Sequence, residues 1–306
     1  MTDDVRYWLG LSAFPGIGPA RFRLLLQYFQ TVKRIWEAPR DTLIEIGFGE
    51  KLTRSFDHFR NTFDLADYQK SLQENHVGVV TVEDFRYPKL LKEIVDPPFL
   101  LYVKGRKMRT PIDMEKTIAI VGSRKATSYG LAITEQLTRD LVAAGYTIIS
   151  GMAYGIDAMA HETAIACGGK TIAVLGCGVD ICAPLVNIHI YRKLSDEGFG
   201  AVVSEMPLGL RPEKGLFVAR NRIISGLSRG VVVVEGEKDS GTLITAKNAA
   251  EQGRDVFAVP GPITSPTSRG PAALLKNGAI LVESAHDILE HVSRLLLSNR
   301  QQKQKP

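Results

Sequence analysis

Apolar residues recur every three or four positions in the first 75 residues, which is the spacing of one face of an α-helix. Phe56, Phe59 and Phe63 show the pattern most simply. From residue 117 the pattern changes to short apolar runs that alternate with amphipathic stretches. The runs predict strands at residues 117–121, 146–149, 171–175, 201–203, 230–235, 255–259 and 279–282. Helices are expected between them, at residues 131–144 and 156–166, and a last one at residues 288–297.

Short apolar strands that alternate with helices predict a parallel sheet covered on both faces. We therefore expect an α/β fold: a Rossmann-like, doubly wound and mostly parallel sheet at residues 115–297. A small all-helical domain, of the SAM-like or helix-hairpin-helix kind, precedes it at residues 1–75. Residues 76–114 contain several prolines and are expected to be a connecting segment with a short strand. The polar tail at residues 298–306 is expected to be disordered.

Two glycines flank one apolar residue at residues 16–18, and residues 43–51 form a weaker copy. This pattern resembles a helix-hairpin-helix, in which backbone N–H groups can hold a DNA phosphate. A tight connection between two helices would need the same glycines. The sequence leaves both interpretations open.

The composition is that of an ordinary soluble protein, with 44% hydrophobic and 23% charged residues in 306. No apolar run approaches the roughly 20 residues that span a bilayer, so no membrane association is expected. Three cysteines without framework spacing favour the reducing cytoplasm and disfavour a metal site. The formal net charge of +5 is too small to identify a polyanionic partner until the charges are located.

Ligands of doubly wound sheets collect where the strands end, so the loops after the strands are the candidate sites. In the first such loop, Gly122 would let a ligand approach the backbone closely. Ser123 and Ser128 offer hydroxyl groups, and Arg124 and Lys125 add positive charge. Together with a helix N-terminus, these groups suit a phosphate, although an ordinary strand-to-helix turn is the alternative. The dinucleotide motif GxGxxG is absent.

Basic residues gather between Arg211 and Arg229, where only one acid interrupts them. Phe217 lies among these cations, and an exposed ring beside guanidinium groups can stack a nucleic-acid base. A core position for Phe217, with the arginines on a solvated helix, is the alternative. The candidates in this segment are Lys214, Phe217, Arg220, Asn221 and Arg222. Gly151 after the second strand and the turn Ser240, Gly241 and Thr242 add further backbone and hydroxyl groups.

As an ordered set, these motifs resemble the DNA-processing protein A (DprA, or Smf) family. The matching segments are residues 122–124 with 128–130, 150–157 with 160–161, 178–180, 204–205, 220–228, 240–246 and 253–261. The resemblance implies a non-catalytic protein without a cofactor that binds single-stranded DNA and loads the RecA recombinase in natural transformation. By motif position it also implies a strand-binding pocket, bordered by Gly151 and the turn at residues 240–242 and formed by Ser123, Arg124, Lys214, Phe217, Arg220 and Asn221. Two departures, Val218 and Ala183 in place of the usual proline and tyrosine, put the local loop shape in doubt.

The resemblance further implies a homodimer formed through the last part of the sheet. Apolar residues there are Leu274, Leu275, Ile280 and Val282. The competing hypothesis is a nucleotide-processing enzyme of the phosphoribohydrolase type, which shares this kind of Rossmann domain. Aligning Gly241 and Thr242 with the motif of those enzymes places Thr245 where their catalytic glutamate stands. Without a carboxylate, the acid–base step lacks its group.

Overall fold

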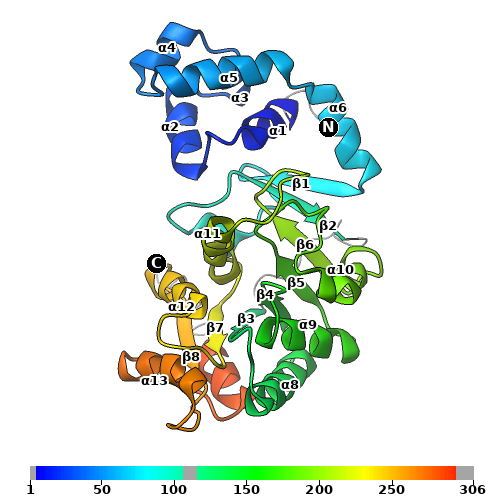
Figure 1. Cartoon of the computed structure of the whole chain (residues 1–306), viewed down its shortest axis with the longest axis vertical. Helices are drawn as coiled ribbons and strands as arrows, with labels where there is room; N and C mark the ends of the chain where they lie inside the picture. The colour runs from blue at the N-terminus through cyan, green and yellow to red at the C-terminus, as the bar shows by residue number, and fades with distance from the viewer. Residues whose placement is uncertain (1–4, 106–115, 294–306) are drawn as a thin grey trace, which may run out of the picture.

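The computed structural model describes residues 5–105 and 116–293. Residues 5–74 form a module of six helices, which we call the helical module (Figure 1). Its helices are α1 (Val5–Ala13), α2 (Pro19–Phe29), α3 (Val32–Trp36), α4 (Arg40–Glu45), α5 (Glu50–Thr62) and α6 (Leu65–Glu74). The three- and four-residue spacing is explained by their core, where Leu9, Ile35 and Phe56 are fully buried.

The glycine turn between α1 and α2 is packed against another helix of the same module. A Cβ on Gly16 would lie 2.5 Å from Leu52 of α5 and 2.5 Å from the ring of Phe14. The Nη1 atom of Arg21 donates a hydrogen bond of 2.9 Å to the Gly16 carbonyl. Close packing therefore explains this glycine without a ligand, which favours the tight-connection interpretation of the turn.

The segment after the helical module contributes two strands to the sheet. Strands β1 (Val77–Thr81) and β2 (Leu100–Lys104) pair antiparallel, and β2 pairs antiparallel with β6 (Gly200–Ser204). A short helix, α7 (Lys89–Lys92), lies between β1 and β2. The segment expected to be a connection with one short strand thus contributes two strands to the sheet, and β2 buries Leu100, Leu101 and Tyr102 almost completely.

Nine strands form one sheet in the order β1-β2-β6-β5-β4-β3-β7-β8-β9. From β6 to β9 every pairing is parallel, so the predicted Rossmann-like, mostly parallel sheet is confirmed. The remaining strands are β3 (Thr117–Val121), β4 (Thr147–Ser150), β5 (Thr171–Val174), β7 (Gly230–Val233), β8 (Asp255–Ala258) and β9 (Ile280–Leu281). The chain winds outward from β3 to β6 and then crosses back to β7, so the strand order reverses between β3 and β7.

Helices cover both faces of the sheet (Figure 1). Those on one face are α8 (Ser128–Ala143), α9 (Ile156–Ala166) and α10 (Ile188–Ser195); those on the other are α11 (Lys214–Gly226), α12 (Gly241–Glu251) and α13 (Arg269–Lys276). Alternate residues of β3 enter the two cores: Ile118 and Ile120 pack with α8 and α9, whereas Ala119 and Val121 pack with α11 and α12. A helix also covers residues 285–293; the rest of the helix predicted at 288–297, like the 298–306 tail, lies outside the described residues.

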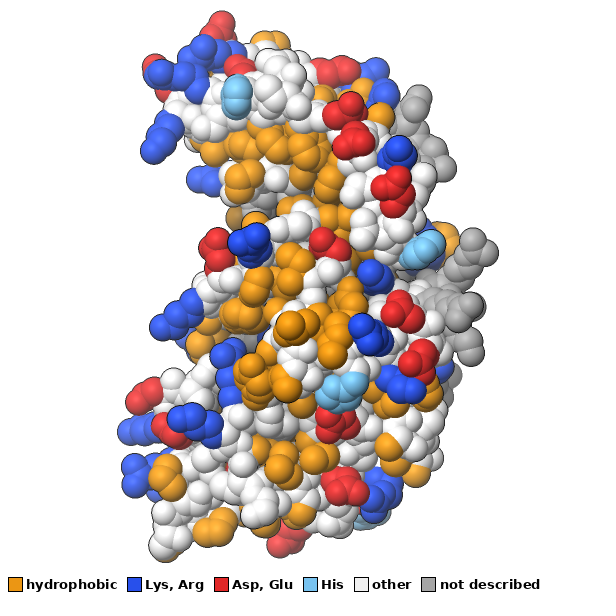
Figure 2. Space-filling model, turned by 45° about the vertical axis from the view of Figure 1, so that its right-hand side comes forward, with side chains coloured by type: hydrophobic (Ala, Val, Ile, Leu, Met, Phe, Trp, Pro, Cys, Tyr) orange, Lys and Arg blue, Asp and Glu red, His pale blue; other side chains and the backbone are white. Residues whose placement is uncertain are grey.

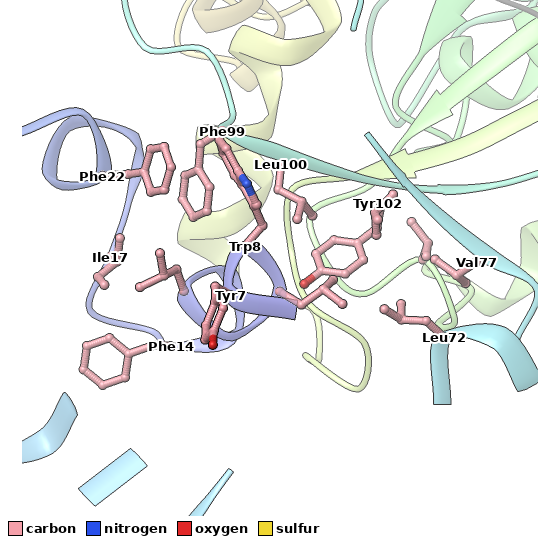
Figure 3. Close-up of a cluster of buried hydrophobic side chains, with 14 of the residues drawn as sticks. Tyr7, Trp8, Phe14, Ile17, Phe22, Leu72, Val77, Phe99, Leu100 and Tyr102 are labelled. Carbon is pink, nitrogen blue, oxygen red and sulfur yellow. The ribbon is translucent and has the colours of Figure 1, made fainter. Parts of the chain in front are cut away.

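The helical module and the sheet share a hydrophobic core (Figure 3). Phe22 of α2 stacks on Phe99 at a centroid distance of 4.0 Å, and Trp8 lies 6.4 Å from the same ring. The hydroxyl of Tyr102 donates a hydrogen bond of 3.1 Å to Ser12. Figure 2 shows a hollow between the module and the rest of the chain. A pocket of about 360 Å³ is lined by residues of α1–α3, of β1 and of the segment after β1.

Candidate nucleic-acid interface

The point where the strand order reverses is occupied by a carboxylate of the protein itself. Glu235 follows β7 and is only 3% exposed. Its Oε2 accepts a hydrogen bond from the backbone N–H of Thr127 (2.9 Å), and its Oε1 accepts one from the Thr127 hydroxyl (2.5 Å). Gly130 makes room, because a Cβ there would lie 2.4 Å from the Glu235 carboxyl carbon. The N-terminus of α8 therefore already faces an anion, which disfavours a phosphate at this position.

The loop after β3 instead presents its cations outward. Arg124 and Lys125 are exposed, while the hydroxyl of Ser123 accepts a hydrogen bond from the Lys125 N–H at 3.1 Å. The guanidinium carbon of Arg124 lies 5.6 Å from the centre of the Phe217 ring. The structure thus brings together the cation and the aromatic ring that the sequence placed 93 positions apart.

The first turn of α11 is held in place by the loop after β5. A Cβ on Gly176 would lie 3.0 Å from backbone atoms of Leu216 and Phe217, so a larger residue would push the two segments slightly apart. Phe217 is half-buried, and Lys214 at the start of the helix is exposed. Phe217 is accordingly partly accessible while its backbone is fixed. Its position lies between the two alternatives from the sequence, an exposed stacking ring and a core residue.

Arg220 differs from the expectation of a surface cation. It is 4% exposed, and its Nη1 donates a hydrogen bond of 2.8 Å to the carbonyl of Gly151. A Cβ on Gly151 would lie 2.5 Å from the guanidinium, so this glycine gives space to the arginine. The reason for the burial is helical periodicity, because Ile223 and Ile224 lie on the same buried face of α11. Arg220 therefore braces the loop after β4 from beneath.

Asp157, like Arg220, is buried beside that loop. Asp157 accepts hydrogen bonds from the N–H groups of Gly151 (3.1 Å) and Ala153 (3.4 Å). Burial raises the pKa of Asp157, and the positive charge of Arg220 opposes that rise. Burial also lowers the pKa of His161 to about 3, with Arg220 adding to the effect. Asp157 therefore holds the loop through these two backbone N–H groups.

His161 carries its proton on Nδ1. The Thr171 hydroxyl donates to the Ile148 carbonyl (2.8 Å), so it accepts from Nδ1 of His161, which lies 2.7 Å away. Within the described part of the chain, Nε2 of His161 and Nε of Arg220 are buried without a hydrogen-bond partner.

Arg222 also differs from the expectation, because two carboxylates hold it. Its Nε lies 2.8 Å from Asp96 and its Nη2 lies 2.6 Å from Glu205. The side chain is 12% exposed, so this cation joins α11 to the β1–β2 connection and to the loop after β6. The sequence analysis placed Arg222 among the DNA-binding cations because its two ion-pair partners, Asp96 and Glu205, lie in other segments of the chain.

The remaining candidates lie where α11 meets α12. The side-chain amide of Asn221 donates a hydrogen bond of 3.2 Å to the carbonyl of Gly241. Gly241 is exposed and Thr242 is 9% exposed, whereas Ser240 has a buried hydroxyl with no hydrogen-bond partner among the described residues. Gly122 and Ser128 stay beside the Arg124 loop, and a Cβ on Gly122 would clash with Ile156 at 2.5 Å.

Comparison with known proteins identifies the family. The model of the DNA recombination-mediator protein A family matches residues 78–293, well over half of the chain. The chain belongs to this family. The protein Smf of Synechocystis is 38% identical over 306 residues, which cover 99% of this chain and 76% of that protein. The DNA processing protein DprA of Bacillus subtilis is 40% identical over 220 residues, 72% of this chain and 73% of that protein.

Solved structures of family members share the fold. The DprA structure from Streptococcus pneumoniae superimposes with a TM-score of 0.79 and 35% identity, over 93% of this chain and 97% of that one. The Helicobacter pylori protein has a TM-score of 0.61 and 29% identity, over 73% of this chain and 98% of that one. That second structure was described for its single-stranded DNA binding mode. The family predicted from the motifs is confirmed.

The residues expected at a family dimer interface lie at the far edge of the sheet. Leu274, Leu275 and Ile280 are half-buried, and Leu281 of the edge strand β9 is 47% exposed. Val282 is 1% exposed within its own chain, so it faces the core and is not available to a partner.

The described ranges contain neither a metal-ligand cluster nor a membrane-spanning helix. Residues 5–105 and 116–293 contain no group of three or more histidine, cysteine or acidic side chains that could hold a metal ion. No helix in the same ranges is both long and apolar enough to cross a membrane.

Sequence reasoning missed Glu235, which closes the strand-reversal point, and Asp96 and Glu205, which hold Arg222. Glu235 carried a usable signal, since an acid directly ends an apolar strand next to the point where the order reverses. Asp96 and Glu205 carried none, because their role depends on contacts between distant segments.

Proposed function

We propose that this protein binds single-stranded DNA through the loops at the carboxyl ends of its parallel strands. The observation that carries the proposal is the exposed guanidinium of Arg124 beside the half-buried ring of Phe217. Cations hold the phosphates and a flat ring stacks a base, so neither contact depends on sequence. The H. pylori relative, described for its single-stranded DNA binding mode, supports the same role here.

The candidate residues have three roles: contact with phosphates or bases, bordering of the strand, and support of the loops. Arg124, Lys125 and Lys214 are exposed and hold phosphates, and Phe217 stacks a base. Ser123, Ser128, Asn221 and the turn Ser240, Gly241 and Thr242 border the strand with polar groups. Gly122, Gly151 and Arg220 act from below by fixing the loops. Arg222 is excluded from direct contact because its charge is neutralised by two carboxylates.

We further propose what the protein does with the bound DNA strand and in which oligomeric state it acts. As the family resemblance implies, the protein delivers the bound strand to the RecA recombinase during natural transformation, as a cytoplasmic homodimer. The exposed edge strand β9 and the half-buried Leu274 and Leu275 support dimerisation at that side. Sedimentation at micromolar concentration is expected to show a dimer, and a monomer would contradict this part of the proposal.

The protein acts without catalytic turnover. The competing phosphoribohydrolase hypothesis requires a carboxylate at the position of Thr245, which is a buried threonine (2% exposed). Glu235, the nearby acid at the end of β7, is engaged by Thr127 and Thr267. Incubation with nucleoside monophosphates is expected to release no free base. Release of base at a rate above the buffer control would revive the enzyme hypothesis.

The binding proposal is tested by anisotropy titrations of the full chain with a labelled oligothymidylate and with a duplex of equal length. We expect tighter binding of the single strand, and a binding constant that falls as salt rises. Equal affinity for the two forms, or no dependence on salt, would refute a single-strand site built on exposed cations.

A further inference from the structure

Three large apolar side chains are exposed next to the candidate interface. Tyr154 is 50% exposed, Leu185 is 72% exposed and Val186 is 60% exposed. Tyr154 belongs to the loop after β4, and the other two form most of the short helix η1 (Leu185–Asn187) before α10. We call these three residues the apolar platform. Single exposed apolar residues are common, but these come from two segments that the structure ties together.

Asn187 makes the tie. It is 4% exposed, and its side-chain amide donates hydrogen bonds to the carbonyls of Met152 (2.9 Å) and Ala153 (3.3 Å). Met152 is fully buried and has a φ of 55°, a backbone conformation that is uncommon for a residue other than glycine. The loop that carries Tyr154 is therefore held in one shape against η1, so the platform is preorganised.

The platform continues directly from the Arg124 loop. A Cβ on Gly155 would lie 2.3 Å from the carbonyl oxygen of Ser123 and 3.0 Å from that of Arg124. The N–H of Ile156 donates to the same Ser123 carbonyl at 3.3 Å. Backbone contacts thus join the Arg124 loop to residues 155–156, and the side chain of Asn187 joins residues 152–153 to η1. Residues 152–156 and 183–187 contain no charged side chain that would repel a polyanion.

We propose that the apolar platform binds unpaired nucleobases of the strand that leaves Phe217. The proposal rests on the proposed function and deepens it, because it gives the DNA site a second, charge-free section. Phosphates held at Arg124 leave the attached bases free to turn toward a surface. Tyr154 offers a flat ring for stacking, and Leu185 and Val186 offer apolar contact, which suits a base of any sequence.

The experiment compares oligothymidylates of two lengths, about 5 and about 20 nucleotides, on the full chain. The variants are Tyr154→Ala and the double variant Leu185→Ser with Val186→Ser. We expect each to bind the long strand roughly ten-fold more weakly, as the loss of one stacked base implies, and the short strand within about two-fold of the wild type. Tyr154→Phe, which keeps the ring, is expected to bind like the wild type.

A long oligonucleotide that is abasic beyond its first five positions provides the decisive comparison. The wild type and the platform variants are expected to bind it equally, since it has no bases to place there. Ile263→Ser removes another exposed apolar side chain (97% exposed) and is the matched control, expected to change nothing.

Variants that bind the long strand like the wild type would overturn the platform, and so would an equal loss on the abasic strand. In both cases single-strand binding by the wild type would stand. Wild-type protein that binds no single strand would instead refute the proposed function, and the platform with it.

Discussion

Arg124 and Arg220 are both arginines of the predicted strand-binding pocket, but their positions assign them different effects on DNA binding. Arg124 is exposed beside Phe217, whereas Arg220 is 4% exposed and hydrogen-bonded to Gly151. A cation that neutralises a phosphate releases a counterion and so contributes to the salt dependence of binding. A buried cation that only shapes a loop does not. Replacing each arginine with methionine is therefore expected to change the salt dependence of DNA binding at Arg124 and not at Arg220.

The magnitude follows from counterion release on single strands, about 0.7 in the slope of log K against log salt for each phosphate. Arg124→Met is expected to lower the slope by about 0.7. Arg220→Met is expected to weaken binding by the same factor at every salt concentration and to leave the slope unchanged. Arg40→Met, which removes an exposed cation from the helical module, is the control and is expected to bind like the wild type.

The assay is a set of anisotropy titrations with one oligothymidylate between about 50 and 200 mM salt. Arg220→Met removes the positive charge that opposes the burial-induced rise in the pKa of Asp157, so a loss in unfolding free energy is expected. Adding Asp157→Asn removes the unpaired charge and should restore much of that stability, so the slope can be measured on folded protein. A slope for Arg220→Met that falls as far as that of Arg124→Met would refute the assignment of Arg220 to loop support.

Three further predictions concern stability, each measured by urea unfolding. Gly151→Ala places a Cβ 2.5 Å from Arg220 and should lower the unfolding free energy by about 1–3 kcal/mol. The control Gly215→Ala, whose Cβ meets nothing within 4 Å, should be neutral or stabilising. Equal effects of the two substitutions would contradict the packing argument. His161 has a depressed pKa in the folded state, so the wild type should lose about 2 kcal/mol more than His161→Asn between pH 6.5 and 5, and parallel pH profiles would count against it. Arg222→Met leaves the buried Glu205 without its ion-pair partner and should lower the unfolding free energy by about 3–5 kcal/mol. Adding Glu205→Gln should restore part of that loss, and no recovery would show that the ion pair is not the cause.

Periodicity made most of the sheet predictable from the sequence. The apolar runs that predicted strands at residues 117–121, 171–175 and 255–259 overlap β3, β5 and β8, because a strand buried on both faces must be apolar throughout. One short strand was predicted in residues 76–114, whereas the structure has two there, β1 and β2, on either side of the prolines. Their place at the edge of the sheet depends on antiparallel pairing with β6, which no local pattern encodes.

The candidate site was predictable as a set of loops, but not in the roles of its arginines. The spacing of Arg220 from Ile223 and Ile224 already put it on the apolar face of α11, a signal that could have been used. The ion pairs of Arg222 with Asp96 and Glu205 bridge segments 126 and 17 residues away. Such pairs depend on how distant segments meet, so charge counting along one segment overestimates the cations available to DNA.

The carboxylate of Glu235 at the strand-reversal point has a consequence for selectivity among small molecules. In many doubly wound proteins this position receives the phosphates of a free nucleotide. Here Thr127 and Thr267 hold a fixed negative charge there, so a mononucleotide meets repulsion where it would otherwise be held most firmly. A polymer that spans several loops does not depend on that one position. If the proposed site is correct, mononucleotides are therefore expected to be poor competitors for the DNA strand.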